Sequence, residues 1–372
     1  MNIVWFSWKD IRHPQAGGAE NISWHLMKSL VRDGHEVCLI TARYPASLAS
    51  ETIDGVRITR VGNRVSVYAR AFWLYRKKLK NWAEVVVDEM NTIPFGCGFY
   101  TRKKSILLTY QLARKVWFYQ MPFPLSVVGY LIEPLYLFTL SRVYQTVLTE
   151  SESTRQDLHR YGFSLSKTKV LRVGIDIEPL KVLAPKPSHN NVLVLGAIRP
   201  MKRTLSAVKS FEYARDNNPA LQLTVAGDNG GAYAQKVMRY VERSRHHEAI
   251  KVLGRVNSEQ RLEAMREASL ILVTSVKEGW GLVVTEANSQ GTPAVAYDCD
   301  GLRDSITDGK TGLLAPSGDE HALGNAINQL VNNPGRYKAL RQAAWESSKR
   351  YTFDNCYRDF LANSGIASKN SR

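Results

Sequence analysis

The chain has 372 residues, of which 44% are hydrophobic and 23% charged, so it is long enough for two packed domains and too apolar to be disordered. Its formal net charge of +16 favours polyanionic partners, either nucleic acid or an anionic membrane face. The four cysteines lie far apart without a C-x-x-C pair, which argues against a disulfide framework and a zinc site. Because the apolar run after Met1 lacks the basic start and length of a secretory signal, we expect a cytoplasmic protein.

The first half of the chain alternates between strand-like apolar runs and helix-like periods. Strands are predicted at residues 2–8, 36–42, 56–61, 84–88, 105–109 and 146–149. Helical spacing over 20–32 follows the first strand, and Ser151 or Ser153 is placed to cap a helix after the last one. This order predicts a Rossmann-like parallel sheet over residues 1–172.

Basic and aromatic residues are interleaved in this first half. They gather in three stretches, at residues 70–82, 102–104 and 114–119. Such a composition suits an anionic membrane interface, and a solvated amphipathic helix is the alternative. Residues 125–140 are strongly apolar but contain Glu133 and Pro134 and are too short to span a bilayer. They are predicted to form a helix that is buried or dips into the interface.

Residues 173–190 contain a glycine and three prolines and lack periodicity, which predicts a linker. After it the α/β pattern restarts. Strands are predicted at 191–198, 221–227, 250–253, 270–274 and 292–297, with helices at 205–215 and 258–268. Residues 191–350 are therefore predicted to form a second doubly wound parallel sheet.

The segment from Glu278 to Glu286 reads E-G-W-G-L-V-V-T-E and follows a predicted strand. A glycine-containing turn that restarts as a helix presents unpaired N–H groups and a positive dipole end, which suits a phosphate. The flanking carboxylates are suited to binding hydroxyl groups. Phosphate and hydroxyls together describe a nucleotide sugar, and the segment resembles the E-x7-E signature of retaining glycosyltransferases of family 4.

This resemblance implies a GT-B fold, in which two Rossmann-like domains face each other across a cleft. The first domain would bind the acceptor and the second the nucleotide sugar. A last helix, at about 351–366, would pack back on the first domain. Neither a cofactor nor a metal ion is implied, and we interpret Asp298-Cys-Asp300, which spells the D-x-D of metal-dependent transferases, as structural.

The phosphate-binding segment of the family resembles residues 195–204. Lys202 occupies the family's lysine position, whereas Ala197 stands where an arginine is usual, and Arg199 is the candidate replacement. The resemblance implies catalytic roles for Glu278, Lys202 and Arg199. It implies donor contacts by Gly17, Gly18, Gly196, Arg199, Lys202, Glu278, Gly279, Trp280, Gly281, Leu282 and Glu286.

The loop 16–20 matches the family's Gly-Gly loop, although plain turn geometry is an alternative interpretation of its glycines. His13 and Gln15 lie in the same loop. Tyr110, with Gln111 beside it, stands where the family usually has a histidine. These four side chains are candidate acceptor or sugar contacts.

Together these patterns predict transfer of a hexose, with retention, to a lipid-linked or cell-envelope glycan at the inner face of the cell membrane. Two alternatives remain. Ala197 and Tyr110 suggest a catalytically silent GT-B scaffold, and the net charge suggests a nucleic-acid-binding protein, for which E-x7-E has no role.

Overall fold

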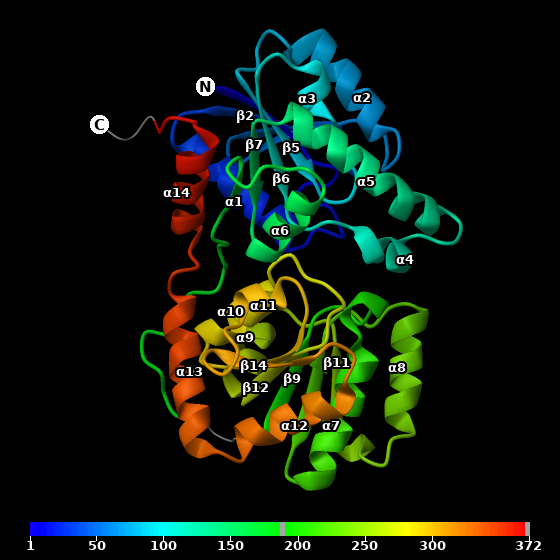
Figure 1. Ribbon diagram of the computed structural model, residues 1–372, viewed down its shortest axis with the longest axis vertical. Coiled ribbons are helices and arrows are strands. Elements are labelled where there is room, and N and C mark those ends of the chain that lie inside the picture. Colours follow the sequence, from blue (N-terminus) through cyan, green and yellow to red (C-terminus); the bar gives the residue numbers. More distant parts are fainter. Residues whose placement is uncertain (187–189, 369–372) are drawn as a thin grey trace. The chain divides into compact units, whose positions relative to one another are not determined.

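The computed structural model describes residues 1–186 and 190–368 (Figure 1). These residues form two compact units. Unit 1 comprises Met1–Gly174 and the segment from Thr352 onward, and unit 2 comprises Ile175–Tyr351. Each unit is an almost wholly parallel sheet with helices on both faces, so the predicted class of two doubly wound α/β domains is confirmed.

The sheet of unit 1 has the order β3-β4-β2-β1-β5-β6-β7-β8. Its strands are β1 Asn2–Phe6, β2 Glu36–Thr41, β3 Ser50–Ile53, β4 Val56–Arg60, β5 Val85–Met90, β6 Lys104–Thr109, β7 Thr146–Thr149 and β8 Thr168–Val170. The β3–β4 pair is antiparallel and the other neighbours are parallel. All six predicted strands are present, and the two short edge strands β3 and β8 were not predicted.

The helices of unit 1 cover both faces of this sheet. They are α1 Gly18–Arg32, α2 Val67–Leu74, the π-helical turn η1 Tyr75–Leu79, α3 Cys97–Tyr100, the 3₁₀ turn η2 Arg114–Val116, α4 Trp117–Gln120, α5 Leu125–Val143, α6 Glu152–Arg160 and α14 Phe353–Ser364. The Ser151 hydroxyl accepts a hydrogen bond from Thr154 N (3.2 Å), as expected for the cap of α6. Valine, isoleucine and leucine are frequent in the inner strands β1, β2 and β5, because these strands are buried on both faces.

Helix α14 belongs to unit 1 although it follows unit 2 in the chain. Phe360 stacks on Trp5 of β1 with ring centroids 6.0 Å apart, and Phe353 stacks on His25 of α1 at 3.5 Å. The Tyr357 hydroxyl donates to Asp33 (2.8 Å) at the end of α1. The last helix thus completes the core on this face of the first sheet.

The sheet of unit 2 has the order β11-β10-β9-β12-β13-β14 and is parallel throughout. Its strands are β9 Asn191–Leu195, β10 Gln222–Ala226, β11 Ile250–Gly254, β12 Leu270–Val273, β13 Ala294–Asp298 and β14 Gly312–Pro316. The sequence predicted five of these and missed β14. Its helical segments are η3 Pro200–Lys202, α7 Thr204–Asn217, α8 Ala232–Glu242, η4 His247–Ala249, α9 Ser258–Glu267, α10 Leu282–Ser289, α11 Leu302–Ser305, α12 Glu320–Val331 and α13 Pro334–Ser348.

Two hydrophobic clusters cover the two faces of this sheet. Val192 and Val194 of β9 pack in the cluster that includes α7, α8 and α12, while Leu193 between them packs with α9 and α10. Alternate residues of one strand therefore serve opposite cores, which is the pattern of a central strand in a doubly wound sheet.

The described part of the predicted linker lies against unit 2. Leu180 N donates to Ser289 O (3.0 Å), and the Trp345 indole donates to Leu180 O (2.9 Å). The Lys186 ammonium donates to Arg266 O and Thr292 Oγ1, both at 2.6 Å. The segment up to residue 186 is thus anchored, and residues 187–189 of the predicted linker lie outside the described residues.

Candidate nucleotide-sugar site

The strand order of unit 2 reverses between β9 and β12. From β9 the chain proceeds outward to β10 and β11, and from β12 it proceeds the other way to β13 and β14. The crevice at the carboxyl ends of two such strands is the usual ligand site of an open α/β sheet. Residues 196–202 follow β9 and residues 274–281 follow β12, so both motifs singled out from the sequence lie at this edge.

Hydrogen bonds join these two loops. The Thr274 hydroxyl donates to Lys202 O (2.8 Å), and Val276 N donates to Met201 O (2.9 Å). The join brings the Lys202 ammonium to 2.5 Å from Glu278 Oε1, which also accepts from the Ser275 hydroxyl. The pair is partly accessible, with 29% of the Lys202 side chain and 16% of the Glu278 side chain exposed. The structure therefore unites two of the three predicted catalytic residues.

Helix α10 begins directly after this pair and has a free amino end. Gly281 adopts φ +91°, and a Cβ there would lie 2.8 Å from Leu302 Cδ2, so the turn needs glycine. Among the described residues no side chain caps α10, and its first turn carries no acid, whereas α9, α12 and α13 are capped by Asn257, Asp319 and Asn333. The N–H groups at the start of α10 are thus available for an anion.

Trp280 and Leu282 flank this glycine. The Trp280 ring is 8% exposed, packs 5.1 Å from the Tyr351 ring, and its indole donates to Thr285 Oγ1 (2.8 Å). Through these two contacts Trp280 holds the turn in place. Leu282 is half-buried at the start of α10. Gly279 is likewise half-buried between Glu278 and this ring.

The loop after β9 passes very close to the loop after β10. A Cβ on Gly227 would lie 1.9 Å from Gly196 O, so no other residue fits at position 227. At Gly196, whose φ is +140°, a Cβ would meet no atom within 4 Å. The Arg199 side chain is exposed and makes no ion pair with any residue that the structure describes. Arg199 is thus free to bind a ligand phosphate, as expected of the candidate replacement for the arginine that is usual at position 197.

Glu286, the second acid of the motif, lies in α10 and is 8% exposed. Its carboxylate forms an ion pair with Arg261 of α9. No sequence pattern indicated this partner, because the two residues lie in different helices and 25 positions apart.

The predicted glycine loop of unit 1 lies at the start of α1. Gly17 N donates to Glu20 Oε2 (2.7 Å), and Glu20 Oε1 lies 3.0 Å from the Lys9 ammonium. Gly17 and Gly18 are both exposed. The start of α1 is thus occupied by a carboxylate of its own first turn.

His13 and Gln15 lie in the loop before α1. His13 Nδ1 accepts from Gln15 N (3.0 Å), and the ring packs edge-on against Trp8 and Tyr44. Burial and the nearby Lys9 charge lower the pKa of His13, so the ring is neutral at neutral pH. The Gln15 side chain is exposed.

Tyr110 is buried in a polar network that the sequence did not indicate. Its hydroxyl lies 2.5 Å from Ser23 Oγ, which donates to the fully buried Glu89 (2.6 Å). Trp5 Nε1 also donates to Glu89 (2.9 Å). Desolvation raises the pKa of Glu89 to about 7, and burial raises that of Tyr110. The Tyr110 hydroxyl is therefore engaged with Ser23, and Gln111 beside it is half-buried.

Comparison with known proteins gives matches over both units. Residues 16–179 match the model described as Glycosyltransferase Family 4, and residues 178–347 match the one described as Glycosyl transferases group 1. The glycogen synthase of Mycobacterium tuberculosis is 25% identical over 218 residues, which are 58% of this chain and 51% of that protein. The chain thus spans about half the length of the curated relatives it matches.

Two solved structures share the fold over nearly their full length. Sucrose-phosphate synthase from Thermosynechococcus elongatus superposes with a TM-score of 0.78 at 19% identity, covering 97% of each chain. HepE from Anabaena, in complex with UDP and glucose, superposes with a TM-score of 0.75 at 17% identity, covering 98% of this chain and 100% of that one. Both halves of the chain are thus similar to glycosyltransferase domains, and the fold is GT-B.

In this GT-B chain the D-x-D segment is neutralised by cations. Arg303 bonds Asp298 (2.8 Å) and Asp300 (2.9 Å), and the Lys277 ammonium lies 3.1 Å from Asp300. These ion pairs hold the loop that follows β13, which fits the structural interpretation of the motif.

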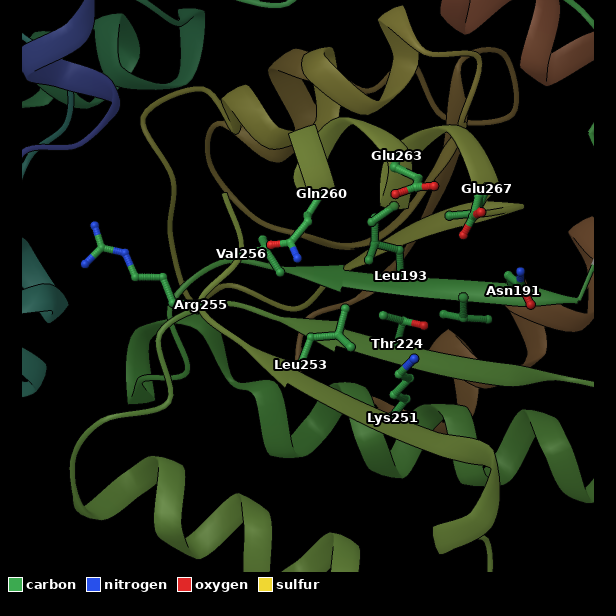
Figure 2. Close-up of a pocket in the computed structure, with 13 residues that line it drawn as sticks. Asn191, Leu193, Thr224, Lys251, Leu253, Arg255, Val256, Gln260, Glu263 and Glu267 are labelled. Atoms are coloured by element: carbon green, nitrogen blue, oxygen red, sulfur yellow. The ribbon is translucent and has the colours of Figure 1, made fainter. Parts of the chain in front are cut away.

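A pocket of about 400 Å³ opens on the second GT-B sheet, between strands β9 to β11 and helix α9 (Figure 2). Arg255, Val256 and Gln260 line it near the carboxyl ends of the strands, and Lys251 and Glu263 line it farther along the sheet. Neither Lys202 nor Glu278 is among its lining residues. The pocket is therefore distinct from the Lys202–Glu278 pair, although both belong to unit 2.

Proposed function

We propose that the chain transfers a hexose from a nucleoside diphosphate sugar to an acceptor, with retention of the anomeric configuration and without a metal ion. One observation supports this most directly. At the switch point of the second sheet, a Lys202–Glu278 pair lies directly before a helix that no side chain of the described residues caps. An ammonium and free N–H groups suit a diphosphate, and a carboxylate suits sugar hydroxyls.

The assignment of roles follows from the movement of charge in the reaction. When the glycosidic bond to the diphosphate breaks, negative charge grows on the leaving oxygens and positive charge on the anomeric carbon. Lys202, Arg199 and the start of α10 would stabilise the leaving diphosphate. Glu278 would hold sugar hydroxyls beside it, and Glu286, oriented by Arg261, would accept from ribose hydroxyls. Lys202 and Arg199 would supply the positive charge that a divalent metal could otherwise provide.

The proposed acceptor is lipid-linked or a cell-envelope glycan, bound by unit 1 at an anionic membrane face. The support is the strongly basic first half of the chain, whose aromatic and cationic residues suit a lipid headgroup layer. The proposed donor is a UDP sugar first of all, because HepE, which shares the fold, is complexed with UDP and glucose.

A thermal-shift screen with UDP, GDP and ADP sugars tests the donor. A ligand present at 100 times its dissociation constant adds about 2.7 kcal/mol of stability, which is readily measured. We expect one nucleotide class to raise the melting temperature of the wild type and of Lys209→Ala, and to leave Lys202→Ala unchanged. Lys209 is the matched control, because this lysine of α7 pairs with Glu320 of α12 and not with a residue of the proposed site. If no nucleotide sugar stabilises the wild type, the proposal is wrong.

A catalytically silent scaffold is the second candidate. It is favoured by Ala197 in place of the usual arginine and by the Tyr110 hydroxyl, which is bonded to Ser23. Slow hydrolysis of a donor that binds in the thermal-shift screen would identify an active enzyme. Binding without hydrolysis or transfer to any acceptor would identify the scaffold. For an active enzyme, the anomer of the product by NMR and activity in EDTA test retention and metal independence.

A further inference from the structure

Helix α5 of unit 1 exposes apolar side chains and buries polar ones, the opposite of an ordinary surface helix. Large apolar side chains recur every three or four residues on its exposed side, at Leu125, Val128, Leu131, Ile132, Leu135 and Phe138. The two most exposed, Leu131 and Leu135, are 63% and 68% accessible. The buried side instead contains Ser126 and Glu133 along with two leucines. Surface helices normally present their apolar stripe to the core, so this stripe has another partner.

The orientation of α5 is fixed by its buried side. The Glu133 carboxylate accepts from Ala113 N (2.8 Å), Arg114 N (2.6 Å) and the Trp117 indole (3.0 Å). Gly129 lies against the Trp117 ring, where a Cβ would come within 2.5 Å. Turning the helix to hide its leucines would break these bonds and leave a buried carboxylate unpaired. The apolar stripe is therefore held outward.

Exposed aromatic residues extend the stripe. Phe118 and Tyr119 lie on α4, and Phe123, which is 83% exposed, lies in the turn between α4 and α5. Figure 1 shows α4 joined to the start of α5 by a short loop. The Phe118 ring packs 5.4 Å from that of Tyr130, so the two groups of side chains are continuous. A contiguous apolar patch of this kind marks an interaction surface.

The surroundings of the patch are cationic. Residues 61–145 contain twelve Lys and Arg against four acids, and three of those acids, Asp88, Glu89 and Glu133, are buried. The basic run Arg76–Lys78 lies in η1, directly after α2. The ring of Phe72 in α2 lies 4.9 Å from that of Tyr100 in α3. Gly98 N, also in α3, donates to the hydroxyl of Tyr144, which directly follows α5, so α3 links the basic run to α5. At the end of the stripe, Arg142 is exposed over the Phe138 ring.

An apolar strip bordered by cations matches one occupant in particular, an anionic bilayer. Acyl chains would receive the leucines, and anionic headgroups would receive the lysines and arginines. A second copy of the chain would instead bring two cationic borders together, which repels. Among the described helices none is long and apolar enough to cross a membrane, so α5 would lie in the membrane plane.

We propose that α5, with α4 before it, is an in-plane membrane anchor whose exposed stripe enters the acyl region of an anionic bilayer. The inference gives the membrane contact of the proposed function a defined surface, which lies in the predicted 114–119 stretch and the predicted 125–140 helix rather than in the 70–82 stretch. That basic stretch then serves the headgroup layer beside the anchor.

The test uses the full chain and neither donor nor acceptor, so its failure is distinct from failure of the proposed transfer reaction. Co-sedimentation is measured with vesicles of phosphatidylcholine containing roughly one-third phosphatidylglycerol, and with phosphatidylcholine alone. We expect Leu131→Glu/Leu135→Glu to reduce binding to the anionic vesicles about tenfold or more. The matched control Leu48→Glu/Val182→Glu makes the same charge change at exposed apolar positions outside α5 and should bind as the wild type does.

A site-specific probe gives a second, independent readout. All four native cysteines are buried, so an environment-sensitive fluorophore can be attached selectively to Leu135→Cys or to the control Val182→Cys. Anionic vesicles should shift the emission to the blue at position 135 and leave it unchanged at position 182. Equal binding by the stripe variant and its control, or no shift at position 135, overturns the proposal. So does a wild-type dimer in light scattering that the stripe variant dissociates, because the stripe is then a protein interface.

Discussion

Each of the two sheets places a lysine–glutamate pair where its strand order reverses, but the two pairs are engaged differently. In unit 1, Lys9 and Glu20 lie 3.0 Å apart and are 13% and 3% exposed, and Glu20 also bonds Gly17 N and thereby caps α1. In unit 2, Lys202 and Glu278 are more accessible and precede an uncapped helix. At the switch point, the helix end beside the pair is therefore closed in unit 1 and open to an anion in unit 2.

The largest expected effect separates the two lysines. Lys202→Met should lower kcat/KM about 10²–10³-fold, because it removes a charge that stabilises the leaving diphosphate, and should change stability little. Lys9→Met should do the opposite. It leaves the buried Glu20 without its cation, so the free energy of unfolding should fall by about 2 kcal/mol while kcat/KM stays within a few-fold. Steady-state kinetics and urea unfolding measure both. Equal loss of activity in the two variants would contradict the comparison.

The next effect concerns the closed polar network of unit 1. The folded pKa of Glu89 is raised to about 7 from an ordinary value of 4.5, so the folded state holds its proton over a range in which the unfolded state has lost it. Its contribution to stability is therefore complete below about pH 4.5 and falls as the pH rises toward 7, by up to about 3 kcal/mol.

Replacement of this carboxyl by an amide isolates the effect. Glu89→Gln should remove the corresponding part of the pH dependence of unfolding, measured with urea between pH 5 and pH 8. An identical slope in wild type and variant would show that Glu89 is ionised in the folded protein throughout this range.

Glycines at the two helix starts offer a smaller and matched test. Gly281→Ala should lower stability by about 2 kcal/mol, because an alanine is strained at φ +91° and its Cβ meets Leu302. Gly17 has an extended backbone at φ −141° and room for a methyl group, so Gly17→Ala should be nearly neutral for stability. A loss of donor affinity in Gly17→Ala without loss of stability would indicate close approach of the ligand to the α1 loop.

The smallest effect concerns Arg261, which acts on the site through Glu286. Arg261→Ala should weaken donor binding roughly fivefold, because a partly exposed ion pair is worth about 1 kcal/mol or less. Arg266→Ala, on the same helix and bonded to Gln290, is the control and should bind the donor normally. Calorimetric titration distinguishes them, and equal affinities would mean that Glu286 needs no such partner.

Most of the fold could be predicted because its central strands are apolar runs of β-branched residues bounded by turns. The three strands that were missed lie at sheet edges. In β3, Ser50-Glu51-Thr52-Ile53 has no buried residue, β8 has three residues, and β14 is flanked by Gly312 and Pro316. One signal was present: Asp54-Gly55, a typical tight-turn dipeptide, joins β3 to β4, and both residues have positive φ.

The candidate site was partly predictable for a similar reason. Lys202 and Glu278 stand in contiguous motifs, whereas the partners Arg261 and Ser23 come from other elements and carry no signal of their own. Tyr110 was expected as a possible sugar contact from its position alone. Its bond to Ser23 depends on the packing of α1 against the end of β6, which no local pattern encodes.

Helix α14 bears on the order in which the polypeptide becomes structured on the ribosome. The residues of unit 2 are contiguous and complete once Tyr351 has emerged, but unit 1 lacks the cover of Trp5 and His25 until Phe353 and Phe360 follow. The half of the molecule that is translated first therefore completes its fold last. Until α14 has been synthesised, nascent unit 1 exposes the hydrophobic face of β1 that contains Trp5.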